Sequence, residues 1–176
     1  LGEEAAAALM RRYRDAFPEA YKESFAPRTA VADVRRLEAL PADDGIGMNL
    51  YQPVGSPANE RRFTIYRTGS PISLTQVLPI LSRMGVDVMD ERPYEIARAE
   101  TEAPAFIYDC GLRFDSDLEA DDEASRHRFT ETFRAIWRGA AESDSFNMLV
   151  PQAGLSWRQA AVLRAYAKFL RQAGST

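Results

Sequence analysis

Glycine-rich loops that bind nucleotides and histidines that act in catalysis are the first patterns to look for, and neither occurs in this chain. Gly45 and Gly47 have the spacing of the first two glycines of a dinucleotide-binding loop, but Leu50 stands where the third belongs and no strand precedes them. The GxxxxGK[ST] pattern of a phosphate-binding loop does not occur. His127 is the only histidine and lies among charged residues on a polar helix face, which is typical of a solvated side chain. The sequence therefore predicts no catalytic and no cofactor-binding residue.

Acidic residues alternate after residue 114, and the run superficially resembles a calcium loop: Asp115, Asp117, Glu119 and Asp121. Such a loop requires glycine at its sixth position and glutamate at its twelfth, where this chain has Ala120 and Arg126. We therefore expect no metal site. The run predicts a solvated loop whose negative charge favours the start of a helix.

The number of cysteines and the net charge indicate in which compartment the protein works and which kinds of partner it does not bind. The single cysteine, Cys110, excludes an intrachain disulfide and fits a reducing cytoplasm. The net charge of −4 argues against nucleic acid and anionic membranes as partners, because phosphate binding relies on clustered Lys and Arg. No apolar run approaches the roughly 20 residues that span a bilayer. We expect a cytoplasmic protein with no membrane and no nucleic-acid partner.

Hydrophobic periodicity predicts an α+β fold with helical flanks. Strands are expected at residues 46–52, 61–68, 86–97 and 105–115. Helices are expected at 74–84, 124–141 and 157–173, with two more before residue 41. Two helices on one face of an antiparallel sheet give an ACT-like or ferredoxin-like order without its usual last strand. The strand at 46–52 could fill that edge, which would be a permuted ACT arrangement.

Individual residues predict where the helices begin and end, where they bend, and which side chain anchors the core. Ser73 is expected to cap the helix at 74–84 and Gly85 to end it, while Pro79 should kink that helix or delay its start. Pro93 predicts an edge, bulge or bend in its strand. Trp137 is expected to anchor its helix in the core.

The strand at 105–115 alternates most clearly. One face carries Phe106, Tyr108, Cys110, Leu112 and Phe114, and the other carries Asp109, Arg113 and Asp115. Cys110 should therefore be buried and unreactive. An RNA-recognition module would use the same sheet with Phe106, Tyr108 and Phe114 as a stacking platform, but its basic-glycine signature is missing here.

The last helix carries apolar groups on more than one side, and Ser156 should cap its start. One stripe comprises Leu163, Tyr166, Ala167 and Leu170, and the second comprises Trp157, Ala161, Ala165 and Phe169. Either both stripes pack within this chain, or one packs against protein outside it.

Several phrases resemble the large bacterial NAD-specific glutamate dehydrogenases, in the segment that carries their ACT-like modules. The phrases are YRDAFPEAYKESFAPRTAVADVRRLEAL, NLYQP, FTIYR, ISLTQVLPILSRMGVDVMDERPYEI, IYDCGLRF and LSWRQAAVLRAYAKFLRQAGST. The resemblance divides the chain into a helical segment at 1–45, an ACT-like domain at 46–142, and a connector with a helix at 143–176 leading towards an absent catalytic region. We therefore expect a fragment of an enzyme of amino-acid catabolism.

The implied parent activity is oxidative deamination of glutamate to 2-oxoglutarate and ammonia with NAD. Neither the lysine-bearing glycine-rich segment nor the Rossmann domain of such an enzyme occurs here, so NAD would bind elsewhere in the parent. The fragment would act as a regulatory or assembly module whose partners are the rest of the parent chain, further subunits of an oligomer, or an amino-acid effector. The alternative is a stand-alone ligand-binding or oligomerisation module with no enzymatic parent.

ACT modules commonly hold a ligand at the loop after their first core strand, which the resemblance places at residues 68–73. Thr68, Gly69, Ser70 and Ser73 are the candidate ligand-binding residues. Gly69 allows close backbone approach, the serines offer hydroxyls, and the following helix presents N–H groups to a carboxylate. An ordinary tight turn with a helix cap is the competing interpretation.

Overall fold

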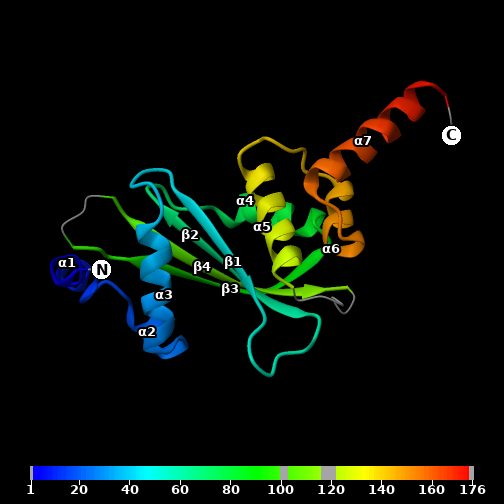
Figure 1. Cartoon of the computed structure of the whole chain (residues 1–176). Helices are drawn as coiled ribbons and strands as arrows, with labels where there is room; N and C mark the ends of the chain where they lie inside the picture. Colours follow the sequence, from blue (N-terminus) through cyan, green and yellow to red (C-terminus); the bar gives the residue numbers. More distant parts are fainter. Residues whose placement is uncertain (1, 100–102, 116–121, 175–176) are drawn as a thin grey trace. The chain divides into compact units, whose positions relative to one another are not determined.

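A four-stranded antiparallel sheet forms the centre of the computed structural model, which describes residues 2–99, 103–115 and 122–174. The strands are β1 (Ile46–Tyr51), β2 (Glu60–Thr68), β3 (Val86–Ile96) and β4 (Ala105–Phe114). They follow one another in the order β1-β2-β4-β3 (Figure 1). β1 thus occupies the edge beside β2, where an ACT domain has its last strand, and the predicted permuted arrangement is confirmed. β3 forms the other edge of the sheet, so Pro93 lies in an edge strand, as predicted.

Helices precede, interrupt and follow the strands. They are α1 (Glu3–Tyr13), α2 (Glu19–Ser24), α3 (Pro27–Glu38), α4 (Leu74–Arg83), α5 (Glu123–Trp137), η1 (Ser145–Met148), α6 (Leu149–Ala153) and α7 (Trp157–Gln172). The short η1 and α6 were not predicted, because segments of four and five residues contain too few turns to show a periodicity. α5 was predicted to reach residue 141, but it ends at Trp137 because Gly139 adopts a positive φ of 71°.

Packing divides the chain into two compact units, and each contains one part of every strand. The first unit consists of Leu1–Met48, Thr64–Ile72 and Glu91–Asp109. The second consists of Asn49–Phe63, Ser73–Asp90 and Cys110–Thr176.

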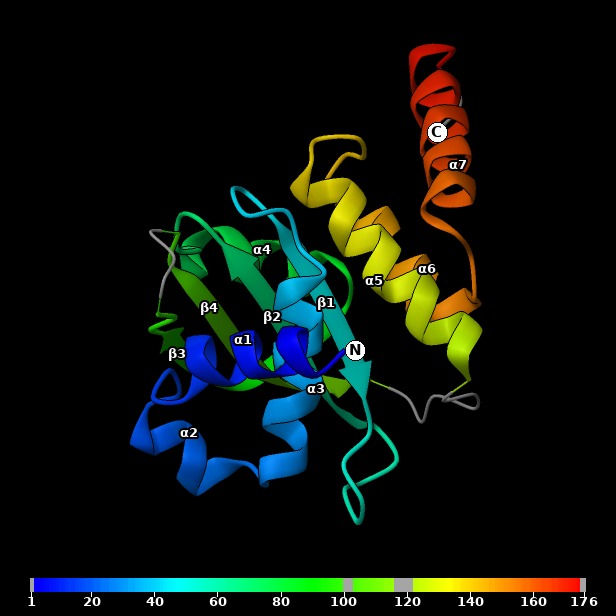
Figure 2. The ribbon, with the colours of Figure 1, turned by 60° about the vertical axis from the view of Figure 1, so that its left-hand side comes forward.

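In the first unit, α1, α2 and α3 gather over the sheet (Figure 2) and bury the tyrosines Tyr21, Tyr66 and Tyr94. A buried carboxylate, Asp33 of α3, accepts hydrogen bonds from the hydroxyls of Tyr21 at 2.6 Å and Tyr66 at 2.7 Å. Burial raises the pKa of Asp33, while the two tyrosine hydroxyls act in the opposite direction. These bonds join α2, α3 and β2 through one polar centre.

In the second unit, α4 and α5 pack on the sheet, as predicted for an α+β fold. Phe63 of β2 is fully buried between Phe129 and Phe133 of α5, with ring centroids 5.5 and 5.2 Å away. Trp137 is only half-buried and stacks on Phe133 at 6.2 Å. The prediction of Trp137 as the core anchor is therefore wrong, because Phe133 faces the sheet and Trp137 lies at the margin one turn later.

β4 is buried on both faces between Ile107 and Leu112, although its sequence predicted one polar face; Arg113, on that predicted polar face, is exposed. Cys110 is fully buried, as expected. Asp109 is buried too, and the Thr64 hydroxyl donates to it at 3.3 Å. Ile107 lies on the same face and packs in the cluster formed with the N-terminal helices. This part of β4 therefore faces protein on its second side.

α4 begins at Leu74, with the Ser73 hydroxyl accepting from the Thr75 N–H at 3.3 Å, and Gly85 follows its end with a φ of 74°. The predicted cap residues are confirmed, but a start delayed by Pro79 is not. The carbonyl of Thr75, which Pro79 cannot bond, belongs to an exposed residue, where water can satisfy it.

Candidate functional site

The predicted ligand loop starts in the first unit, where the chain's own groups engage Thr68. This residue is buried, and its hydroxyl donates to the Pro41 carbonyl at 2.7 Å while accepting from the Gly45 N–H at 3.0 Å. The Thr68 N–H donates to the Gly45 carbonyl at 3.0 Å. Thr68 therefore holds the segment 41–45 against the loop.

Gly69 is in close contact with the same segment. Its φ is 86°, a conformation that favours glycine, and its N–H donates to the Pro104 carbonyl at 3.0 Å. A Cβ at this position would lie 2.7 Å from Asp43 Oδ1. The close approach predicted for a ligand is thus made by residues 41–45.

Arg67 stabilises this loop through hydrogen bonds and an ion pair. Its guanidinium is buried, donates to the Asp44 carbonyl at 3.0 Å and the Ser70 carbonyl at 3.1 Å, and pairs with the Asp44 carboxylate. Ser70 itself is exposed. In the second unit, the exposed Ser73 caps α4 and contacts the Thr75 hydroxyl at 2.7 Å. Ser70 and Ser73 are thus the accessible members of the predicted set.

The other residues whose side chains could take part in catalysis or bind a metal do not cluster. His127 is exposed on α5, and Cys110 is buried in the sheet. Within residues 2–99, 103–115 and 122–174, no cluster of three histidine, cysteine or carboxylate side chains could hold a metal ion. Asp117, Glu119 and Asp121 lie outside those ranges. No helix in the described part of the chain is long and apolar enough to cross a membrane.

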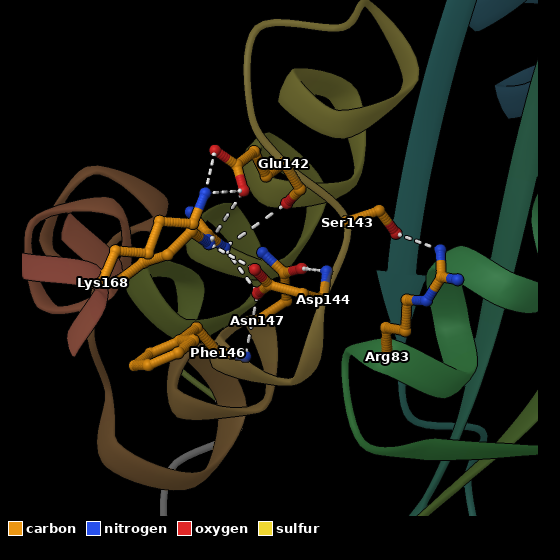
Figure 3. Close-up of polar contacts among 8 residues, drawn as sticks. Arg83, Glu142, Ser143, Asp144, Phe146, Asn147 and Lys168 are labelled. Atoms are coloured by element: carbon orange, nitrogen blue, oxygen red, sulfur yellow. Dashed lines mark hydrogen bonds and ion pairs between the residues drawn. The ribbon is translucent and has the colours of Figure 1, made fainter. Parts of the chain in front are cut away.

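A buried polar cluster joins the middle of α7 to the preceding connector, and sequence reasoning missed it. Arg164 is only 4% exposed, and its guanidinium donates to both carboxylate oxygens of Asp144, at 2.5 Å from Nε and 2.8 Å from Nη2. Asp144 also caps η1, accepting from the Phe146 N–H at 3.0 Å, and Asn147 completes the capping box (Figure 3). We call Arg164 and Asp144 the α7 clasp.

The electrostatics of the α7 clasp favour its charged form. The hydrogen bonds from Arg164 lower the pKa of Asp144 below its ordinary value, and those bonds raise the pKa of Arg164. One turn later, Lys168 donates to Glu142 at 2.9 and 2.8 Å, and this pair is exposed (Figure 3). Arg83 reaches the same connector and donates to the Ser143 hydroxyl at 3.2 Å. The clasp therefore fixes α7 to the connector through one buried cation.

The side of α7 away from the clasp is apolar and exposed. Its large side chains are Val162, Leu163, Tyr166, Phe169 and Leu170, which we call the α7 stripe. At about 100° per residue, Tyr166 lies on the opposite side of the helix from Arg164. Tyr166 and Phe169 are each 65% exposed. The later turns of α7 extend beyond α5 and α6 in both views (Figures 1 and 2).

These exposures contradict one of the two packing hypotheses for the last helix. Neither predicted stripe forms its buried face, which centres on Ala160 and Arg164. The hypothesis that both stripes pack within this chain is therefore wrong, because exposed side chains occur in both: Leu163, Tyr166 and Leu170 in one stripe and Phe169 in the other.

Comparison with known proteins places three family segments along the chain. The profile for the glutamate dehydrogenase ACT3 domain matches residues 45–125. Helical motif 2 of glutamate dehydrogenase matches residues 1–40, and helical motif 3 matches residues 141–176. The order of these segments agrees with the observed order of helices, sheet and helices.

Three similar proteins are named NAD-specific glutamate dehydrogenase. That of Halomonas elongata is 39% identical over 171 residues, covering 97% of this chain and 10% of the relative. That of Mycobacterium tuberculosis is 39% identical over 170 residues, covering 92% and 10%, and that of Pseudomonas aeruginosa is 34% identical over 172 residues, covering 98% and 11%. The chain thus spans about a tenth of the length of these relatives.

Proposed function

Because this chain belongs to the glutamate dehydrogenase family, as a segment with its ACT3 domain and helical motifs 2 and 3, we propose that it is a non-catalytic assembly module of a parent enzyme. The parent would convert glutamate, NAD and water to 2-oxoglutarate, ammonia and NADH, as the name of the relatives suggests. NAD would bind in another part of the parent. We also propose the cytoplasm as its compartment and the three-part division at residues 45 and 142.

The α7 stripe is the observation that carries this proposal. A contiguous line of large apolar side chains on a soluble helix marks an interaction surface more often than a solvated face. Since these five side chains are about half exposed, completing their burial would contribute on the order of 1 kcal/mol each. The α7 clasp holds the opposite side of the helix, so the stripe is presented in a fixed orientation relative to the connector. The occupant we propose is the rest of the parent chain.

Recognition of an amino-acid effector at residues 68–73 is the second candidate function. The observation that favours it is the ordered loop, with Gly69 in its left-handed conformation and exposed hydroxyls at Ser70 and Ser73. The assembly role is preferred because Thr68 and Gly69 already bond to the protein itself. Titration of the chain with amino acids, followed by backbone chemical shifts, tests the effector role. Shifts centred on residues 68–70 would support it, and no shift at millimolar ligand would refute it.

A comparison of two contexts tests the assembly role. Tyr166→Glu should change the melting temperature of the 176-residue chain little, because the side chain is exposed there. In the full-length enzyme the same substitution should lower the melting temperature and weaken assembly, since a carboxylate would be buried against apolar protein. Val54→Glu is the matched control, because Val54 is a fully exposed apolar residue of the β1–β2 loop. Equal and negligible effects of Tyr166→Glu in both contexts would refute the proposal.

A further inference from the structure

A second apolar surface lies far along the sequence from α7, in a groove between α1 and α3. The groove has a volume of about 810 Å³. Its apolar lining includes Leu9, Met10, Tyr13, Phe17, Val31 and Val34. This volume lies within the range of ligand sites, but an open trough between two helices has the shape that receives a third helix.

Two large apolar side chains at the groove are exposed. Met10 on α1 is 75% exposed, and Val31 on α3 is 55% exposed. Tyr13 beneath them is buried, and Leu9 and Val34 are half-buried. The apolar surface therefore continues from the floor of the groove onto both helices, as expected of a docking surface for an extended apolar face.

The charged residues of the groove all have one sign. Arg11, Arg14 and Arg35 contribute to its lining, and no carboxylate does. Arg14 and Arg35 are exposed and form no ion pair with any described residue. By contrast, Arg12 on the same helix pairs with Glu38 at 2.6 Å. Arg14 and Arg35 thus place positive charge beside an apolar floor, and an occupant with negative charge would complement them.

We propose that this groove binds an amphipathic helix whose apolar face is flanked by Asp and Glu residues. The proposal rests on the assembly role above, because it assigns that helix to the part of the parent enzyme outside these 176 residues. The relatives are about ten times longer than this chain, so a parent of that size supplies many helices. The α7 stripe of a second copy fits poorly, since α7 contains no acidic residue and carries Arg158, Lys168 and Arg171.

Photo-crosslinking in the purified full-length enzyme tests this assignment. p-Benzoylphenylalanine replaces Val31, with replacement of the loop residue Val54 as the control, and mass spectrometry identifies the crosslinked peptide. The expected product joins Val31 to a parent segment with apolar residues at i, i+3, i+4 and i+7 and with flanking acidic residues. A product at Val31 no more abundant than at Val54, a crosslink to α7 of a neighbouring subunit, or a crosslink to a segment without acidic flanks would overturn the proposal.

Charge reversal separates the electrostatic claim from simple apolar contact. Arg14→Glu combined with Arg35→Glu should reduce the crosslink yield by about fivefold or more, because like charges then face each other. Arg138→Glu, at an exposed position after α5, should leave the yield unchanged. An unchanged yield in the double variant would overturn the acidic-helix assignment. Failure of the assembly role itself would appear separately, as an α7 stripe that stays exposed in the full-length enzyme.

Discussion

The α7 clasp supplies the most quantitative prediction. Arg164 is nearly inaccessible, whereas the Asp144 side chain is 34% exposed, so the pair lies between a surface ion pair and a buried one. Surface pairs contribute about 0–1 kcal/mol, and breaking a fully buried pair costs about 3–5 kcal/mol. Two charge-assisted hydrogen bonds place this pair between those limits. We expect Arg164→Ala to lower the free energy of unfolding by about 2–3 kcal/mol.

A double-mutant cycle with urea unfolding of the 176-residue chain measures the coupling directly. Arg164→Ala, Asp144→Asn and the double variant should give a coupling free energy of about 1.5–2.5 kcal/mol at pH 7. Lys168→Ala is the matched control on the same helix, because its pair with Glu142 is exposed and should contribute less than about 0.5 kcal/mol. A coupling no larger than that of the control would refute the reasoning that burial of Arg164 makes the clasp strong.

The pH dependence of the coupling has a defined sign. Hydrogen bonds from Arg164 lower the pKa of Asp144 in the folded state from its ordinary value of 3.8. The stabilisation is therefore fully present above that ordinary value and is lost as the pH falls through the lower, folded-state pKa. The coupling measured at pH 7 should persist at pH 5 and decline only in stronger acid.

Three further outcomes are expected. Phe133→Ala should lower the free energy of unfolding by about 3–5 kcal/mol and Trp137→Ala by clearly less, because Trp137 is half-buried; equal losses in urea unfolding would contradict this. Cys110 should resist a thiol reagent under native conditions and react on unfolding, whereas rapid native labelling would show an open sheet. Burial and a hydrogen bond to Glu38 raise the pKa of Tyr13 to about 12. The stabilisation from the protonated Tyr13 hydroxyl is therefore fully present below the ordinary pKa of 10.0 and is lost as the pH rises through about 12. Absorbance titrations of the chain and of its Tyr13→Phe variant isolate this tyrosine by difference, and a difference that titrates near pH 10 would contradict the raised pKa.

Local sequence signals predicted the sheet well because each depends on near neighbours. Alternation located β1, β2 and β4 within a residue or two of their observed ends. The place of β1 beside β2 followed from the need to cover the edge that a missing last strand would leave. Ser73, Gly85 and Ser156 marked helix ends, since caps are chosen by backbone geometry within one turn.

Long-range packing accounts for what the sequence did not predict. Asp109 looked solvent-facing, and its buried environment depends on segments distant in the sequence, including Thr64 on β2. Arg164 belongs to neither predicted stripe, and its partner Asp144 lies 20 residues earlier in the connector. Thr68 and Gly69 looked accessible, because the segment that engages them, residues 41–45, is distant in the sequence, with bonds to Thr68 from residues 23 and 27 positions earlier. A helical periodicity shows which faces are apolar, but it does not show which of them finds a partner.

Radical footprinting of the α7 stripe tests the central claim most directly, because it measures side-chain accessibility in the chain and in the full-length enzyme. Tyr166 and Phe169 are each 65% exposed in the 176-residue chain and should be modified readily there. We predict that modification of both falls several-fold in the full-length enzyme, while modification of Tyr51, outside the stripe, stays the same. Equal modification of Tyr166 and Phe169 in the two proteins would contradict the assignment of α7 as an assembly surface.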